Sequence, residues 1–294
     1  MSKKKILVVL GGNSREREIS IKTGLACIKA IKKLGYKVEK FDPKLKSFFE
    51  IKKNNADIIF NALHGEEGED GYAQSFFEYS KIPYTHSGVL ASMNAMNKLV
   101  SKKIFINNKI KTPIYNVIKK KDFNVNKFIK KKNNNFKFPL VVKPNNEGSS
   151  IGVYIVENDG DLERAISANE KISSDFIAED YIEGLEYTVG ILGDSALPVI
   201  KLLPPGKFYD FNAKYESDKM QYICPSQLDD SMEYELKKIS LNCFKACGCK
   251  GWGRIDIIID DKGNPWVIEL NTVPGMTYHS LVPLAAKQRD INFE

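Results

Sequence analysis

The chain has 294 residues, of which 43% are hydrophobic and 28% charged, a composition typical of a globular protein with two or three compact units. The apolar run Ile6–Leu10 is too short for a signal-peptide core, and no run approaches the length of a membrane span. The formal net charge of +7 indicates a solvated basic surface, because no helix-turn-helix, zinc or RNA-binding signature accompanies it. We therefore expect a cytoplasmic protein that binds neither a membrane nor nucleic acid.

The first third of the chain alternates strand and helix patterns. Buried strands are expected at residues 5–10, 36–42 and 56–63. A helix that ends near Gly35 follows the first strand, and its apolar face is expected at Ile21, Leu25, Ile28 and Ile31. This alternation predicts a parallel sheet whose ligands gather beyond the carboxyl ends of the strands. Two glycine turns, GGNSRERE and HGEEGEDG, follow such ends, and the acidic run of the second is interpreted as solvated.

The pattern changes around Pro83. One helix is expected over LASMNAMNKLVSKKIFINN, followed by short strands, a capped helix at DGDLERAI and two strands in FIAEDYIEGLEYTVGILGD. A later helix, ended by Gly248, is expected to bury Cys243 and Cys247 as apolar residues rather than metal ligands. The five cysteines show no paired C-x-x-C spacing, so we expect no disulfide.

The segment GRIDIIIDDKGNPWVIELNT reads as a β-hairpin. A two-residue turn at Lys262-Gly263 would pair Asp261 with Asn264. That register places four polar side chains on one face, with Asp256 opposite Glu269 and Arg254 opposite Asn271. Two carboxylates and an amide oxygen are ligands that suit Mg²⁺, and the arginine could bind an anion. An exposed, salt-bridged hairpin face is the other interpretation of the same pattern.

The loop VVKPNNEGSSIGV, residues 141–153, has three possible interpretations: a hydrolase nucleophile, a phosphate-binding loop or a tight turn. The two serines fail the G-x-S-x-G pattern, and a base for a serine hydrolase would have to be His64, His86 or His279. No G-x-G-x-x-G or Walker motif occurs in the chain. The hydrolase therefore stays a weak hypothesis.

Eight motifs, taken in chain order from about Ile6 to Pro283, resemble those of the D-alanine:D-alanine ligases of the ATP-grasp superfamily. They are GGNSREREIS, HGEEGEDG, SGVLASMNAMNK, VVKPNNEGSSIGV, EDYIEGLEYTVG, YDFNAKY, GWGRIDIIID and ELNTVPGMTYHSLVP. The resemblance implies an α/β (α+β ATP-grasp) fold: a Rossmann-like parallel-sheet domain, 1–86, then central and C-terminal ATP-grasp domains, 87–180 and 181–294, that clamp ATP. It also implies that ATP phosphorylates one D-alanine and that a second attacks the acyl phosphate, giving D-alanyl-D-alanine, ADP and phosphate for peptidoglycan synthesis.

The resemblance further implies a cofactor site, matched here position by position. Two Mg²⁺ (or Mn²⁺) ions would be held by Asp256, Glu269 and Asn271. Phosphates would be bound by Lys98, Lys143, Ser150 and Lys214. Adenine would lie on Glu179, Asp180, Tyr181 and Ile182, and ribose on Glu186.

The substrate residues follow in the same way. The catalytic set implied is Glu16, Ser149, Tyr215, Arg254 and Gly275; the substrate-binding set is His64, Ser280 and Leu281. Glu16 would hold the ammonium group of the first D-alanine, and Tyr215 would close a loop over the site. Two positions depart from the family pattern, Asn97 where aspartate is usual and His86 where glycine is common. A homodimer is also implied, while a catalytically silent nucleotide-binding protein is the alternative that keeps the fold.

Overall fold

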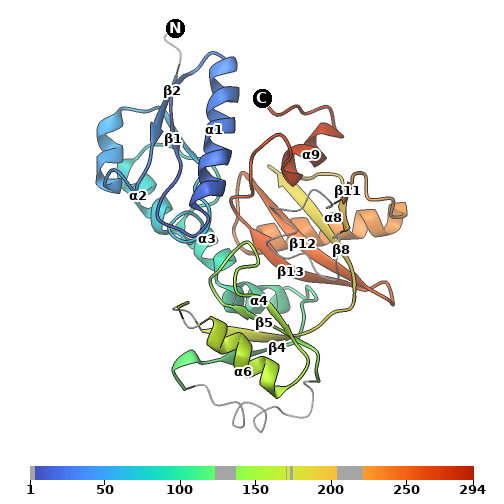
Figure 1. Ribbon diagram of the computed structural model, residues 1–294. Coiled ribbons are helices and arrows are strands. Elements are labelled where there is room, and N and C mark those ends of the chain that lie inside the picture. The colour runs from blue at the N-terminus through green and yellow to red at the C-terminus, as the bar shows by residue number, and fades with distance from the viewer. Residues whose placement is uncertain (1–3, 123–136, 170, 173–174, 204–220) are drawn as a thin grey trace.

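The computed structural model describes residues 4–122, 137–169, 171–172, 175–203 and 221–294 (Figure 1). Lys214, Tyr215 and most of the Lys/Asn-rich segment before Phe138 lie outside these residues. The described chain forms three β-sheets, one after another along the sequence. Among the helices described, none is both long and apolar enough to cross a membrane.

The N-terminal sheet is parallel, as the alternating pattern predicts, with the strand order β2-β1-β3. Its elements are β1 (Lys5–Val9), α1 (Arg17–Lys33), β2 (Lys37–Phe41), η1 (Phe48–Asn54), β3 (Ile58–Asn61) and α2 (Tyr72–Ser80). The predicted face of α1 is wrong in part, because Leu25 is 50% exposed. Ile21, Ile28 and Ile31 do pack with Val8 and Leu10, as predicted. At Gly24 the helix comes close to the sheet, because a Cβ added there would lie 2.6 Å from the Cβ of Leu10.

The helix expected as one piece after Pro83 is two helices, α3 (Val89–Met96) and α4 (Lys98–Asn107). The break lies at Asn97, whose backbone is extended and whose side-chain oxygen accepts a hydrogen bond from the amide of Val100 at 3.1 Å. Asn97 is therefore the N-cap of α4, a role that an aspartate fills equally well.

The central sheet has the order β4-β7-β5-β6 and is antiparallel throughout. Its elements are β4 (Tyr115–Ile118), η2 (Lys120–Asp122), β5 (Leu140–Pro144), β6 (Tyr154–Val156), α6 (Asp159–Ala168) and β7 (Phe176–Asp180). The predicted helix α6 is capped by Asn158 and packs Leu162 into the core of this sheet. The loop between β5 and β6 carries the serines of the GSS motif.

The C-terminal sheet has the order β11-β10-β8-β12-β13, with β9 paired beside β8. Its elements are β8 (Gly184–Leu192), β9 (Ser195–Ala196), β10 (Ile200–Leu203), β11 (Gln221–Ile223), α8 (Asp230–Ala246), β12 (Trp252–Asp260), β13 (Pro265–Asn271) and α9 (Leu281–Lys287). Helix α8 buries Cys243 beside Leu236 and ends at Cys247, also buried, with Gly248 at φ +75°, as predicted. Helices α3 and α4 share the core of this sheet through Ala95 and Phe105.

The β12–β13 hairpin has the predicted register at its inner end but not at its turn. Near the turn Asp260 pairs with Asn264, so the predicted pairing of Asp261 with Asn264 is wrong. A β-bulge at Ile268 then adds one residue to β13 and shifts the register back. Asp256 therefore lies opposite Glu269, as the sequence predicts. The one-residue error in the predicted turn and the one-residue bulge at Ile268 therefore cancel, and the polar face has the predicted register.

Candidate active site

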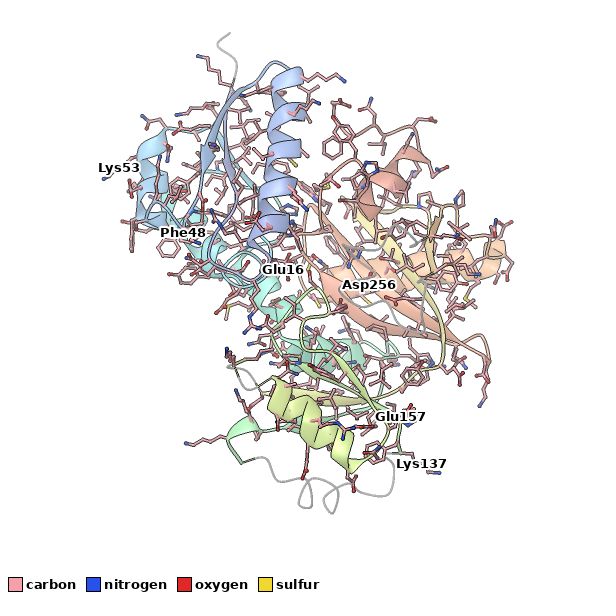
Figure 2. All side chains as sticks on the ribbon, in the orientation of Figure 1. Glu16, Phe48, Lys53, Lys137, Glu157 and Asp256 are labelled. Atoms are coloured by element: carbon pink, nitrogen blue, oxygen red, sulfur yellow. The ribbon has the colours of Figure 1, made fainter. Side chains whose placement is uncertain are left out.

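Two adjoining cavities lie where the three sheets meet. The first, of about 290 Å³, is lined by β5 and β7 of the central sheet and by β8, β10, β12 and β13 of the C-terminal sheet. The second, of about 480 Å³, is lined by α1, by the loop after β3, by β12 and β13 and by the start of α9. Figure 2 labels Glu16 beside α1 and Asp256 on the C-terminal sheet, on opposite sides of this region. Three residues line both cavities and mark their junction: Lys98, Glu147 and Glu269.

The polar face of the hairpin is built around Asp256, whose side chain is 4% exposed. Arg254 donates to both carboxylate oxygens, from Nε at 2.9 Å and from Nη2 at 2.7 Å. Thr188, on the neighbouring strand β8, donates from Oγ1 to Oδ1 at 2.6 Å. Glu269 and Asn271 come from β13 on the same face. The salt bridge between Arg254 and Asp256 is therefore present, but the interpretation of this face as exposed is wrong, because both side chains are largely buried at the cavities.

The donor set of this face fits a hard divalent cation. Asp256 and Glu269 supply carboxylate oxygens and Asn271 supplies an amide oxygen, which are the ligands that Mg²⁺ and Mn²⁺ prefer. Asn271 Oδ1 also accepts a hydrogen bond from the amide of Val273 at 3.0 Å, which fixes the direction of its side chain. A cation bound here would share the carboxylate of Asp256 with Arg254.

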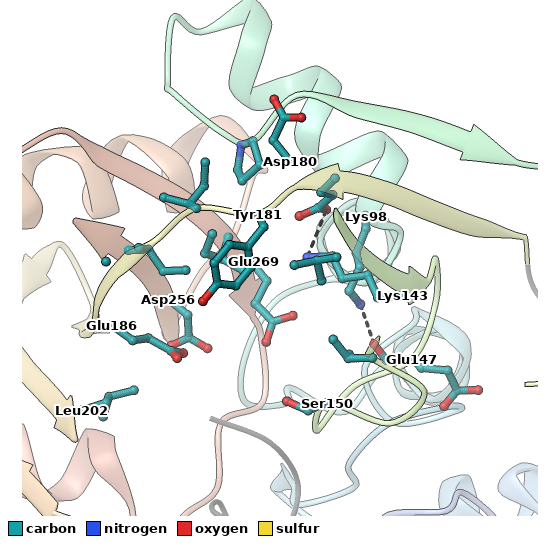
Figure 3. A pocket seen from close by; sticks show the side chains of 18 of the residues that line it. Lys98, Lys143, Glu147, Ser150, Asp180, Tyr181, Glu186, Leu202, Asp256 and Glu269 are labelled. Atoms are coloured by element: carbon teal, nitrogen blue, oxygen red, sulfur yellow. Dashed lines mark hydrogen bonds and ion pairs between the residues drawn. The ribbon is translucent and has the colours of Figure 1, made fainter. Parts of the chain in front are cut away.

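The lysines of the first cavity lie on the opposite wall from the carboxylates of Asp256 and Glu186 (Figure 3). Lys143 is 4% exposed, and its Nζ lies 3.0 Å from Glu179 Oε1. Lys98 is 7% exposed and donates to the backbone oxygen of Glu147. Burial lowers the pKa of Lys98, and Lys143 lowers it further, against the charge of Glu269. Two buried cations beside an open cavity favour an anionic ligand.

The remaining predicted cofactor residues also line the first cavity. They are Ser150, Glu179, Asp180, Tyr181, Ile182 and Glu186. The segment 179–182 leaves the end of β7 and crosses to β8, so its backbone borders the cavity between the two sheets. Lys214 lies outside the described residues.

The two serines of the GSS motif face different cavities. Ser149 lines the second cavity and Ser150 the first, and both have left-handed backbone conformations, with φ of +50° and +58°. Gly148 precedes them, and a Cβ there would lie 2.7 Å from Glu16 Oε1. The loop therefore forms the wall between the cavities and brings the carboxylate of Glu16 against its backbone.

His64 is buried at the second cavity between two partners. Its Nδ1 lies 3.3 Å from Glu69 Oε1 and its Nε2 lies 3.0 Å from Thr23 Oγ1. Burial lowers the pKa of His64, but the hydrogen bond and charge of Glu69, helped by the charge of Glu16, raise it above the ordinary value. Glu69 is 6% exposed, so the interpretation of the acidic run as solvated is wrong at this residue.

The far wall of the second cavity is formed by Gly275, Ser280 and Leu281. Ser280 precedes α9, and its Oγ accepts a hydrogen bond from the amide of Thr277 at 2.9 Å. A Cβ added to Gly275 would lie 3.3 Å from that Oγ, so the chain passes close to the serine. Every predicted site residue that the structure describes thus lines one of the two cavities; Tyr215 lies outside the described residues.

Three polar residues with a place in the site were missed by sequence reasoning: Glu69, Thr188 and Lys102. Lys102 could not be told from many other lysines by its sequence, because its burial depends on contacts with Thr112 and Glu179. Thr188 carried no signal either, because its contact with Asp256 depends on the pairing of β8 with β12. The hydrolase hypothesis weakens for two of its three candidate bases, since Nε2 of His64 lies 3.0 Å from Thr23 Oγ1 and Nε2 of His86 lies 3.2 Å from the backbone oxygen of Asn61.

The chain matches two family models over most of its length. Residues 38–87 match the model described as D-ala D-ala ligase N-terminus, and residues 104–294 the model described as D-ala D-ala ligase C-terminus. It is 42% identical to the D-alanine–D-alanine ligase of Alcanivorax borkumensis, over 99% of this chain and 90% of that protein. It is 43% identical to the one of Buchnera aphidicola subsp. Schizaphis graminum, over 99% and 96%. The crystal structure of D-alanine–D-alanine ligase from Bacillus anthracis complexed with ATP matches with a TM-score of 0.84 at 33% identity, over 99% and 93% of the two chains.

Proposed function

The chain belongs to the D-alanine–D-alanine ligase family of ATP-dependent ligases, and from that premise we propose that it joins two D-alanine molecules at the junction of the two cavities. ATP occupies the first cavity and both amino acids occupy the second. The single observation that carries this assignment is the sharing of Lys98, Glu147 and Glu269 by the two cavities. A phosphoryl group must pass from nucleotide to carboxylate, so the two binding sites have to meet.

The charges of the second cavity support a zwitterionic substrate. Glu16 supplies the anion for an ammonium group, while Arg254 and His64 supply cations for a carboxylate. The raised pKa of His64 favours its charged form beside such a carboxylate. Ser280 and Leu281, at the other wall, border the position of the second D-alanine.

The first step transfers the γ-phosphoryl group of ATP to a carboxylate oxygen of the first D-alanine, with ADP leaving. Lys98 and Lys143 bind the phosphates and offset the negative charge that accumulates between the two anions. Asp256, Glu269 and Asn271 would hold Mg²⁺ (or Mn²⁺), two ions in all, which supply charge neutralisation at the phosphates when bound. The segment 179–182 and Glu186 border the position of the nucleoside.

In the second step the ammonium group of the second D-alanine loses a proton to solvent, and its amine attacks the acyl carbon. The C–N bond forms first, the C–O bond to phosphate then breaks as inorganic phosphate leaves, and the nitrogen gives up a second proton to become the amide. The attack places negative charge on the former carboxyl oxygen, and Arg254, oriented by its two hydrogen bonds to Asp256, lies at the cavity to offset it. Ser149 and Glu16 lie on the same wall and orient the first substrate. Tyr215 is proposed to close over the site, which would exclude water from the acyl phosphate.

The wider setting is also part of the proposal. We divide the chain into domains at 1–86, 87–180 and 181–294, a division that follows the three sheets approximately. The product would serve peptidoglycan synthesis in the cytoplasm. A homodimer is proposed, and exposed apolar side chains on the N-terminal part, Phe49, Tyr79 and Leu90, support the presence of a partner surface there.

The test is an ADP-release assay with Mg²⁺ that compares D-alanine, L-alanine and D-alanine together with D-lactate. We expect ADP only when both D-alanine and Mg²⁺ are supplied, and D-alanyl-D-alanine as the product by mass. Glu269→Gln should abolish turnover while the melting temperature stays close to that of the wild type. A folded wild-type protein that releases no ADP in response to D-alanine would refute the proposal, and a fully active Glu269→Gln variant would refute the metal assignment.

A further inference from the structure

Behind the lysines of the first cavity lies a further lysine, Lys102, whose residue is 0% exposed. It lies one helical turn after Lys98 on α4. Its Nζ donates to Thr112 Oγ1 at 2.6 Å and lies 3.1 Å from Glu179 Oε1. It also lies 5.7 Å from the ring centroid of Tyr115. Lys102 lines neither of the two cavities of the described chain, so it does not bind ligand directly.

The carboxylate of Glu179 connects this hidden lysine to the cavity. The same Oε1 that faces Lys102 lies 3.0 Å from the Nζ of Lys143, which does line the cavity. Glu179 is 2% exposed, so solvent screens these interactions little. One carboxylate oxygen is thus shared between a structural cation and a ligand-facing cation.

This arrangement bears on the electrostatic potential at Lys143. With Glu179 and Lys143 alone, the carboxylate would neutralise the ammonium group and an incoming phosphate would meet no net positive charge. Lys102 adds a second ammonium group at the same carboxylate oxygen and offsets its charge, so the potential that a phosphate meets at Lys143 is more positive. Burial lowers the pKa of Lys102 to about 8, with Glu179 acting in the opposite direction, so the group is mostly charged at neutral pH.

We propose that Lys102 is a positioning residue for nucleotide binding: it shares the carboxylate of Glu179, and so leaves Lys143 available to the phosphates of ATP. The inference rests on the proposed assignment of ATP to the first cavity. It predicts an effect that is specific to ATP, because the contacts of Lys102 belong to the first cavity and not to the second.

The test compares Lys102→Met with Lys103→Met, which removes the neighbouring exposed lysine of the same helix. Binding of ATP is measured by calorimetry without D-alanine, and KM for ATP, KM for D-alanine and kcat are measured separately. We expect Lys102→Met to weaken ATP binding and raise KM for ATP by about tenfold, with KM for D-alanine changed less than about twofold. Lys103→Met should behave as the wild type. ATP affinity of Lys102→Met within twofold of the wild type overturns the inference.

A double-mutant cycle with Glu179→Gln tests the route of the effect. In that background the amide no longer competes for Lys143, so adding Lys102→Met should cost less than about threefold in ATP affinity. An undiminished tenfold loss would mean that Lys102 acts independently of Glu179, contrary to the inference. If Lys102→Met does not fold, Lys102→Gln takes its place, because it removes the charge and keeps a donor for Thr112 and Glu179. It should also raise KM for ATP by about tenfold, and a KM for ATP within twofold of the wild type overturns the inference. A wild-type protein that binds no ATP would instead refute the proposed function itself.

Discussion

The hydroxyl of Thr188 offers the sharpest probe of the proposed metal-binding face. Thr188 is 0% exposed, and its Oγ1 lies 2.6 Å from Asp256 Oδ1 and 3.1 Å from the backbone oxygen of Ile255. A hydroxyl donates one hydrogen, and the shorter contact to a charged acceptor takes it. Thr188→Val removes this donor and leaves the shape of the side chain almost unchanged.

Two effects follow, and each has its own measurement. A hydrogen bond to a buried charged group contributes about 2 kcal/mol to the free energy of unfolding, so the melting temperature should fall by roughly 4 °C. Loss of a residue that orients a metal ligand typically weakens metal binding by about 10- to 100-fold. The Mg²⁺ concentration for half-maximal turnover should therefore rise by at least about tenfold. Mn²⁺ binding in the presence of ADP, followed by calorimetry, should weaken in parallel.

Thr188→Ser is the matched control, because it keeps the hydroxyl and removes only the methyl group. Its Mg²⁺ requirement should stay within about twofold of the wild type, although lost packing lowers its stability by about 1 kcal/mol. An unchanged Mg²⁺ requirement in Thr188→Val, or an equal shift in Thr188→Ser, would refute the role of the hydroxyl in orienting Asp256.

Three other substitutions test separate features. Asp260 accepts hydrogen bonds in the hairpin turn, the most important from Trp266, and these lower the pKa of its carboxyl group to about 2. The ionised carboxylate therefore stabilises the fold above pH 4, and this stabilisation is lost as the pH falls toward 2. Asp260→Asn should lower the melting temperature at pH 7 and should lower it progressively less below pH 4. Asn97→Ala should cost about 1 kcal/mol in chemical denaturation, whereas Asn97→Asp should be nearly neutral; equal losses would exclude capping. Gly148→Ala should displace the carboxylate of Glu16, because the added Cβ would lie 2.7 Å from its Oε1. KM for D-alanine should rise by about tenfold or more while KM for ATP changes little. A raised KM for ATP with an unchanged KM for D-alanine would contradict the assignment of the cavities.

The part of the site that the sequence predicted best was the part governed by strand periodicity. Alternation with period two is enough to place Arg254 and Asp256 on one face. Their pairing with Asn271 and Glu269 was predicted from a turn that is wrong by one residue, and it holds because the bulge at Ile268 cancels that offset. Contacts between segments distant in the chain could not be predicted in this way. In the sequence Lys102 resembles many other lysines of this chain. It is buried only because the fold places Glu179 of β7 beside it.

Local sequence also misled where tertiary packing decided the outcome. The apolar residue Leu25 matched the helical period but is half exposed, whereas its neighbour Gly24 is the residue of α1 that lies against Leu10. Asn97 lies within a continuous helical pattern, yet its side chain offers the backbone a cap, and the chain turns there. The first outcome was decided by tertiary packing and the second by a local hydrogen bond, and neither is visible in the periodicity.

The bulge at Ile268 has a practical consequence for engineering. The bulge lies between the turn of the β12–β13 hairpin and the end that carries Asp256 and Glu269. A change in the length of the turn therefore need not alter the strand register at Asp256 and Glu269. Residues 261–263 at the tip are exposed, and the space beside Gly263 is open. A reporter peptide inserted at this tip should leave the ligand geometry undisturbed, which makes it a suitable attachment point for immobilising the protein with both cavities accessible.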